Sequence, residues 1–95
     1  MKLTLLARAY CHLCDEMLAA VLPLAHAHGA TVQVIDVDAA GNASLEAVWG
    51  DLVPALFAGA PGSATLLCHY HLDVGRVAMV LGAPIESPVA DGNPL

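Results

Sequence analysis

Residues 3–14, Leu-Thr-Leu-Leu-Ala-Arg-Ala-Tyr-Cys-His-Leu-Cys, decide how this chain folds. The apolar run predicts a buried strand over residues 2–7, and a helical pattern begins near Asp15. Cys11 is therefore expected at a strand-to-helix turn, where the unpaired backbone N–H groups of the helix favour negative charge. Because a thiolate is the species that attacks a disulfide, we predict that Cys11 is the more acidic and more exposed thiol. Cys14 is close enough in the sequence to form a disulfide with Cys11, and a C-x-x-C sequence in this setting is typical of a redox-active pair.

The composition of the chain limits the partners that it can bind. The 95 residues make one domain, and 3 Lys and Arg against 9 Asp and Glu give a formal net charge of −6 with His neutral. Nucleic acids are excluded as partners because phosphate binding needs clustered cations, and anionic membranes are disfavoured for the same reason. No uninterrupted apolar run approaches the roughly 20 residues that a membrane helix needs.

The N-terminus has only a weak likeness to a secretion signal. Lys2 precedes an apolar run of about half the usual length, and Arg8 and Tyr10 stand where small residues would precede a cleavage site. The odd number of cysteines, 3, also argues against the disulfide framework of a secreted protein. We therefore expect a cytoplasmic protein, and we expect it to be a monomer.

The rest of the chain alternates helical and strand patterns. Apolar residues at spacings of three and four predict a helix over residues 12–28 that Gly29 ends. Pro23 is expected either to kink this helix near residues 19–22 or to break it and begin a second short helix. β-branched residues predict a strand over residues 31–37, joined to the first strand by a right-handed parallel crossover. The remaining segments are expected as a helix over 43–49 begun by Asn42, strands over 53–58 and 64–70 that form a hairpin around the turn 59–63, and a helix over 72–82 that Pro84 ends.

The order βαβαββα with C-x-x-C after the first strand resembles the thioredoxin superfamily. Its small glutaredoxin-like branch is the more similar one, because residues 6–14 look like that family's strand end, basic residue and Cys-His-Leu-Cys site. Residues 49–54, Trp-Gly-Asp-Leu-Val-Pro, look like its Tyr-Gly-x-x-Val-Pro segment. The resemblance implies an α/β fold with a four-stranded mixed sheet and helices on both faces. It covers residues 1–84, which we expect to form the domain, and leaves residues 85–95 as a disordered tail.

The resemblance also implies an activity, that of a thiol–disulfide oxidoreductase. Cys11 would attack a substrate disulfide, and Cys14 would then displace the reduced product. In the family the proline that corresponds to Pro54 is cis and faces the dithiol, and Val53 would pair its backbone with an extended substrate segment. The other substrate-binding candidates are Arg8, His12 and Leu13.

Three of these candidates have alternative interpretations. Pro54 is either the cis proline that the resemblance implies or an ordinary proline of an edge strand. His12 either favours the Cys11 thiolate when it is protonated or points into solvent. Arg8 supplies positive charge near Cys11, or binds a glutathione carboxylate, or is a solvated strand end. Trp49 is interpreted as helix-to-sheet packing.

The expected partners are a disulfide-containing protein or a small-molecule thiol substrate, with a reductase or glutathione to recycle the dithiol. No bound cofactor is needed. Glutathione-binding glutaredoxins carry a Gly-Gly pair after the fourth strand and an Asp that begins the last helix. This chain has Leu-Cys-His-Tyr-His-Leu-Asp over residues 67–73, which lacks the glycine pair and retains only the acidic residue, as Asp73. Bulky side chains hinder close approach to a backbone, so we predict weak or absent glutathione binding.

Two alternatives to an enzyme remain at this point. A metal site would use Cys11, Cys14 and Cys68 with His69 and His71, but the fourth strand is expected at the sheet edge, away from the end of the first, and the spacing is not that of a zinc finger. We therefore interpret Cys68 as a small core residue and predict no metal ligands. An adaptor that uses the fold without redox turnover is the other alternative, because a fold does not determine a function.

Overall fold

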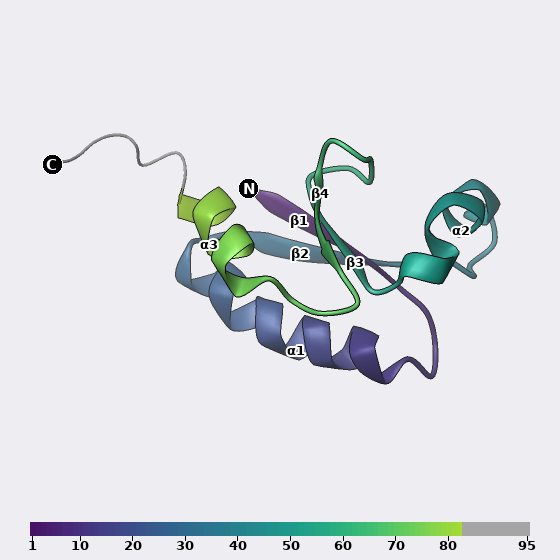
Figure 1. Ribbon diagram of the computed structural model, residues 1–95, viewed down its shortest axis with the longest axis horizontal. Helices are drawn as coiled ribbons and strands as arrows, with labels where there is room; N and C mark the ends of the chain where they lie inside the picture. Colours follow the sequence, from purple (N-terminus) through teal and green to yellow (C-terminus); the bar gives the residue numbers. More distant parts are fainter. Residues whose placement is uncertain (83–95) are drawn as a thin grey trace, which may run out of the picture.

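A computed structural model describes residues 1–82 of the chain (Figure 1). The predicted tail over residues 85–95 and the predicted helix end at Pro84 lie outside these residues. Within them, the strands and helices follow the predicted order, with a short 3-10 helix, η1, before the third strand. The elements are β1 (Lys2–Ala7), α1 (His12–Ala27), β2 (Thr31–Asp36), α2 (Ala43–Trp49), η1 (Gly50–Leu52), β3 (Ala55–Ala58), β4 (Leu66–His69) and α3 (Val74–Gly82).

The four strands form one mixed sheet in the order β2-β1-β3-β4. β1 pairs in parallel with β2 and antiparallel with β3, and β3 pairs antiparallel with β4. Leu5, in the middle of β1, lies opposite Val34 on one side and Leu56 on the other. The predicted α/β fold with a four-stranded mixed sheet is therefore confirmed, and β4 lies at an edge, separated from β1 by β3.

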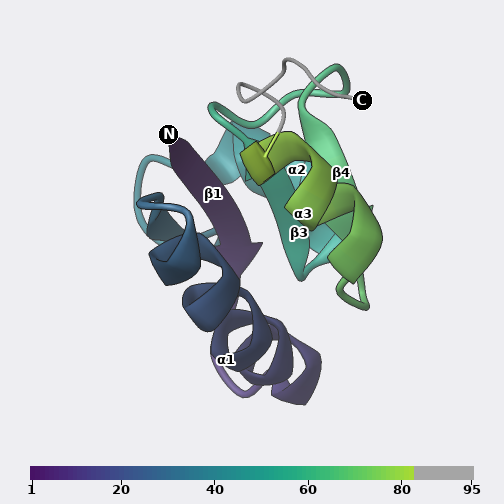
Figure 2. The ribbon, with the colours of Figure 1, turned by 90° about the vertical axis from the view of Figure 1, so that its left-hand side faces the viewer.

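Helices cover both faces of the sheet because successive side chains of β1 point to opposite faces. Leu3 and Leu5 pack with α1 and α3, whose buried positions include Met17 and Val77. Leu6 faces the other way and belongs to a second apolar cluster, against which α2 packs. Figure 1 shows α2 and α3 at opposite ends of the molecule, and Figure 2 turns the view so that α3 faces the reader. No helix in residues 1–82 has both the length and the apolar character that a membrane span requires.

Helix α1 runs without interruption from His12 to Ala27 although Pro23 lies inside it, so the predicted break is not found. Pro23 is exposed, while Val21 and Ala25 on either side are buried and hold the helix against the sheet. The end of the helix agrees with its sequence signal. Gly29 has φ +69°, and the N–H groups of Gly29 and Ala30 donate to the carbonyls of His26 and Ala25 at 3.2 and 2.8 Å.

The starts of β3 and α3 differ from the predictions, and local chemistry explains both differences. β3 begins at Ala55 rather than residue 53, because η1 and Pro54 come directly before it. α3 begins at Val74 rather than residue 72, because Asp73 caps it and its Oδ1 accepts the N–H of Arg76 at 3.0 Å. α2 begins after Asn42 as predicted, but the side-chain amide of Asn42 donates to the Asp36 carbonyl at 2.8 Å and does not cap the helix.

Candidate active site

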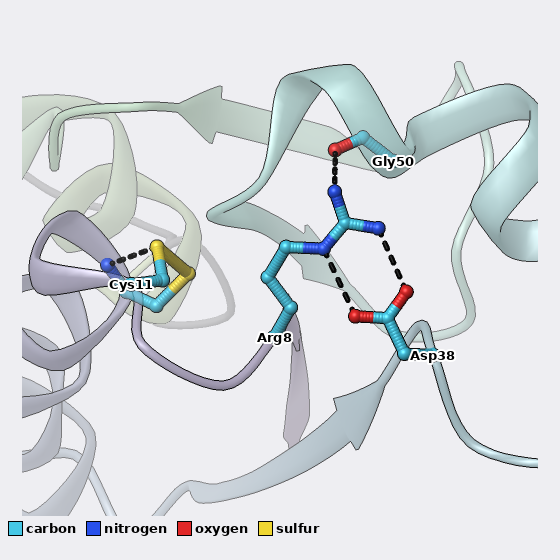
Figure 3. The surroundings of a disulfide bond; sticks show 5 residues. Arg8, Cys11, Asp38 and Gly50 are labelled. Atoms are coloured by element: carbon cyan, nitrogen blue, oxygen red, sulfur yellow. Dashed lines mark hydrogen bonds and ion pairs between the residues drawn. A yellow bond between two sulfur atoms is a disulfide. The ribbon is translucent and has the colours of Figure 1, made fainter.

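The two cysteines of the motif form a disulfide at the N-terminus of α1 (Figure 3). Cys11 is the N-cap residue, with extended backbone angles of φ −113° and ψ 103°, and its Cα lies 5.2 Å from that of Cys14. The Sγ atom of Cys11 accepts the backbone N–H of Cys14 at 3.1 Å. This N–H has no partner inside the helix, and it would also stabilise negative charge on the sulfur after reduction.

The two sulfur positions differ in their access to solvent. Cys14 is only 3% exposed, because it faces the sheet together with Met17, whereas Cys11 is half-buried. The more exposed position is therefore Cys11, as the sequence predicts. Of the residues between them, His12 is exposed and Leu13 is half-buried. Tyr10, directly before the motif, is fully exposed and has a positive φ of 58°, which no sequence signal indicated.

Arg8 follows β1 and binds three partners with its guanidinium group (Figure 3). Its Nε and Nη2 atoms donate to the two carboxylate oxygens of Asp38 at 3.1 and 2.8 Å. Nη2 also reaches Oε2 of Glu46 at 3.2 Å, and Nη1 donates to the Gly50 carbonyl at 3.3 Å. These contacts tie the end of β1 to the loop after β2, to α2 and to η1.

The charge of Arg8 is balanced by these neighbours. The hydrogen bonds to Asp38 and, next, to Glu46 raise the pKa of Arg8 above its ordinary value. Figure 3 shows the Arg8 side chain turned away from the disulfide and toward Asp38 and Gly50. Arg8 is thus neither a free cation beside Cys11 nor a solvated strand end in this structure. The roles expected of it toward substrate stay predictions.

Sequence reasoning missed the partners of Arg8, although a signal for one of them was present. Parallel strands end at the same edge of a sheet, and Arg8 and Asp38 each follow one of the two strands predicted to be parallel, so the sequence alone could have placed these two residues near each other. Glu46 and Gly50 are one helical turn apart, which places them on the same side of a helix but only weakly indicates that both contact Arg8.

Val53 and Pro54 lie between η1 and β3, and the peptide bond between them is cis. Pro54 is fully buried and its carbonyl accepts the N–H of Tyr70 at 2.8 Å, while Val53 is partly exposed. The contact of Pro54 with the dithiol and the binding of substrate at Val53 stay predictions.

Two pockets flank the motif. The first has a volume of about 240 Å³ and lies beside Cys14; its polar lining residues are Arg8, Asp15 and Asp36. The second has a volume of about 170 Å³ and lies between α1 and the segment after β4. Leu13 and Glu16 line it from the helix, and Tyr70, His71 and Leu72 from the other side. Carboxylates therefore line a pocket on each side of the motif.

The third cysteine, Cys68, lies on β4 at the sheet edge and is half-buried. Burial raises the pKa of its thiol. Next to it, His69 stacks edge-on against Tyr70, with ring centroids 4.6 Å apart. No group of three or more His, Cys, Asp or Glu side chains in residues 1–82 is arranged to hold a metal ion. Trp49 packs edge-on against Phe57 at 5.0 Å, which confirms the interpretation of Trp49 as helix-to-sheet packing.

The chain has recognisable relatives. It is 37% identical to protein Ne2328 from Nitrosomonas europaea, whose solution NMR structure superimposes with a TM-score of 0.68 over 83% of this chain and 88% of that one. It is 30% identical to the structural genomics target protein XcR50 from X. campestris, whose X-ray structure gives a TM-score of 0.59 over 90% of this chain and 99% of that one. No curated protein matches. Residues 2–88 match the family described as glutaredoxin-like domain (DUF836), and the chain belongs to this family.

Proposed function

We propose that this protein is a thiol–disulfide oxidoreductase whose Cys11 is the nucleophile and whose Cys14 is the resolving thiol. The observation that carries the proposal is the placement of the two sulfurs. They form a disulfide at a helix N-terminus, the more exposed one accepts a backbone N–H, and the other is buried beneath it. Reversible formation of such a bond is what dithiol exchange requires.

The reaction transfers two electrons from the dithiol to the substrate. The Cys11 thiolate attacks one sulfur of a substrate disulfide, a mixed disulfide forms, and the first substrate thiolate leaves and takes up a proton. The Cys14 thiol then loses its proton and attacks the Cys11 sulfur, so the second substrate thiol leaves and the Cys11–Cys14 disulfide forms. A thiol reductase or glutathione returns the two electrons to the pair.

The neighbouring residues support these steps. The N–H of Cys14 stabilises the thiolate of Cys11 by a hydrogen bond to its sulfur, and the helix dipole acts in the same direction. Leu13 places an apolar side chain in the pocket beside the motif, and Val53, which is partly exposed directly before Pro54 and β3, is suited to pair its backbone with an extended substrate segment. Pro54 is proposed to shape the floor of that groove, and His12 is proposed to contact substrate from the exposed side of the motif.

The proposed setting is that of a cytoplasmic monomer that uses no bound cofactor and binds no nucleic acid or membrane. The acidic net charge of −6 supports the last two points. Glutathione is proposed to bind weakly, because bulky side chains such as Tyr70 and Leu72 stand between β4 and α3, where glutathione-binding relatives have glycines.

A redox titration tests the proposal. The protein is equilibrated in dithiothreitol buffers of graded potential, and the oxidised fraction is measured by the mass added on alkylation. Titrations that start from the reduced and from the oxidised protein are expected to give the same curve, with the slope of a two-electron reaction. Cys68→Ser is expected to leave this curve unchanged. If no intramolecular disulfide forms in an oxidising buffer, the protein is an adaptor; if purified protein carries one zinc per chain that Cys68→Ser removes, it is a metal protein.

A further inference from the structure

Arg8 stands at the junction of the segments that surround the active site. Its fork-like pair of hydrogen bonds to Asp38 fixes the orientation of the guanidinium plane. From that fixed position Nη1 holds the carbonyl of Gly50, the first residue of η1 and three residues before Val53. One side chain thus links the start of the loop that carries Cys11 to the segment that leads into Val53 and Pro54.

Gly50 supplies a second, independent observation about this network. A Cβ atom added to Gly50 would overlap the carboxylate of Glu46 and approach its Cγ to 3.2 Å. The backbone of Gly50 is an ordinary right-handed helical one, with φ −55° and ψ −37°, so no strain calls for a glycine there. The absent side chain leaves the space in which Glu46 reaches Arg8.

The network leaves Arg8 without a free positive charge. Two carboxylates oppose one guanidinium. The Arg8 side chain is 31% exposed, and its guanidinium group does not point at the disulfide. The other cations of the chain are Lys2, at the opposite end of β1, and Arg76 on α3, and neither lines the pockets beside the motif. The charges that do line them are those of Asp15, Asp36 and Glu16, besides Arg8 itself.

We propose that Arg8 is a positioning residue for the η1–Val53 turn and that Asp38 and Glu46 neutralise its charge, so that it does not attract substrate carboxylates. The site therefore selects cationic and neutral disulfides over anionic ones. This inference rests on the proposed oxidoreductase activity and names the substrate class of the same site. Glutathione disulfide belongs to the disfavoured class because it carries carboxylates at both ends.

Three small disulfides of similar size test the selectivity: cystamine, which is cationic, bis(2-hydroxyethyl) disulfide, which is neutral, and 3,3′-dithiodipropionate, which is anionic. Each oxidises the reduced protein at low ionic strength and about pH 8, where an ordinary imidazole is uncharged. Each rate constant is divided by the rate constant of the same disulfide with dithiothreitol. We expect the normalised rates to fall in the order cationic, neutral, anionic, by about threefold or more per step, and to converge in about 0.5 M salt.

Four variants connect the selectivity to Arg8. Glu46→Gln removes one negative partner, and Gly50→Ala displaces Glu46 without a change of charge, so both are expected to raise the anionic-to-neutral rate ratio. Arg8→Lys keeps the charge but has no fork, so it is expected to lower the rate with the neutral disulfide. Lys2→Gln is the control for a change of net charge away from the site, because Lys2 lies at the other end of β1, and it is expected to leave every ratio unchanged.

The outcomes separate the two proposals. Equal normalised rates for the three disulfides, or ratios that Glu46→Gln and Gly50→Ala do not move, would overturn the role of Arg8 and leave the oxidoreductase intact. Failure of all three disulfides to oxidise the Cys11–Cys14 pair would overturn both. Circular dichroism of each variant shows whether it is folded. If Arg8→Lys does not fold, the order of the three normalised rates in the wild-type protein and the rate ratio in Glu46→Gln still test the role of Arg8.

Discussion

The Sγ atom of Cys11 accepts a hydrogen bond from the backbone N–H of Cys14, 3.1 Å away, across the first turn of α1. A backbone donor that points at a sulfur favours the thiolate over the thiol, and the helix N-terminus adds to the effect. The same turn buries Cys14 to 3% exposure. One local geometry thus separates an attacking sulfur from a resolving sulfur.

Limited alkylation of the reduced protein is expected to label Cys11 first. Its sulfur is more exposed than that of Cys14 and its thiolate is stabilised, whereas Cys14 is buried. The reduced protein is treated with less than one equivalent of iodoacetamide at neutral pH, and the label is mapped by peptide mass. Predominant labelling of Cys14 would contradict the assignment of the nucleophile.

Cys68 is expected to react slowly near neutral pH and to need a higher pH than an ordinary thiol. Burial raises the pKa of its thiol, so the folded state holds the proton more tightly than the unfolded chain does. The stability that this provides is present below the ordinary thiol pKa and is lost as the pH rises through the raised value.

The measurement for Cys68 is the pH dependence of its alkylation in the Cys11–Cys14 oxidised protein, compared with that of glutathione. A midpoint at or below that of glutathione would show that burial does not control the thiol. Cys68→Ser provides the control for the pH dependence of unfolding, because it removes only this titrating group.

Phe57→Ala is expected to lower the free energy of unfolding by about 3–5 kcal/mol, because Phe57 is fully buried and forms the edge-on contact that holds Trp49. Trp49 is the single tryptophan of the chain, so its fluorescence reports unfolding in urea directly. Val48→Ala is the matched control: Val48 lies on the exposed side of α2, so about 0.5 kcal/mol or less is expected. Similar losses for the two variants would contradict the packing described for α2.

Gly29→Ala is expected to destabilise the protein by about 1–2 kcal/mol through the backbone alone. Gly29 has φ +69°, and no atom lies within 4 Å of the position that a Cβ would take, so crowding does not contribute. Gly29→Asn is expected to lose less, because asparagine tolerates the left-handed conformation. Urea midpoints of the two variants measure the difference, and equal losses would show that the end of α1 does not depend on this conformation.

The sequence predicted those features that depend on local patterns. The bounds of β1 and α2 agree to the residue, because each is a short apolar or helical run with clear flanking signals. The break at Pro23 was wrong because burial of Val21 and Ala25 overrides the local effect of a proline. The partners of Arg8 were not predicted, because Asp38, Glu46 and Gly50 come together only when the ends of β1, β2 and α2 meet in space.

Trapping of a mixed disulfide is the most direct test of Cys11 as the nucleophile and Cys14 as the resolving thiol. Reduced Cys14→Ser protein is mixed with a disulfide-linked model peptide, and the adduct is located by peptide mass. We expect a stable adduct on Cys11, because the resolving thiol is absent. We expect no adduct for Cys11→Ser, and an unchanged adduct when Cys68→Ser is added. An adduct on Cys68, or no adduct on Cys11 under conditions where free cysteine forms one, would show that Cys11 is not the nucleophile.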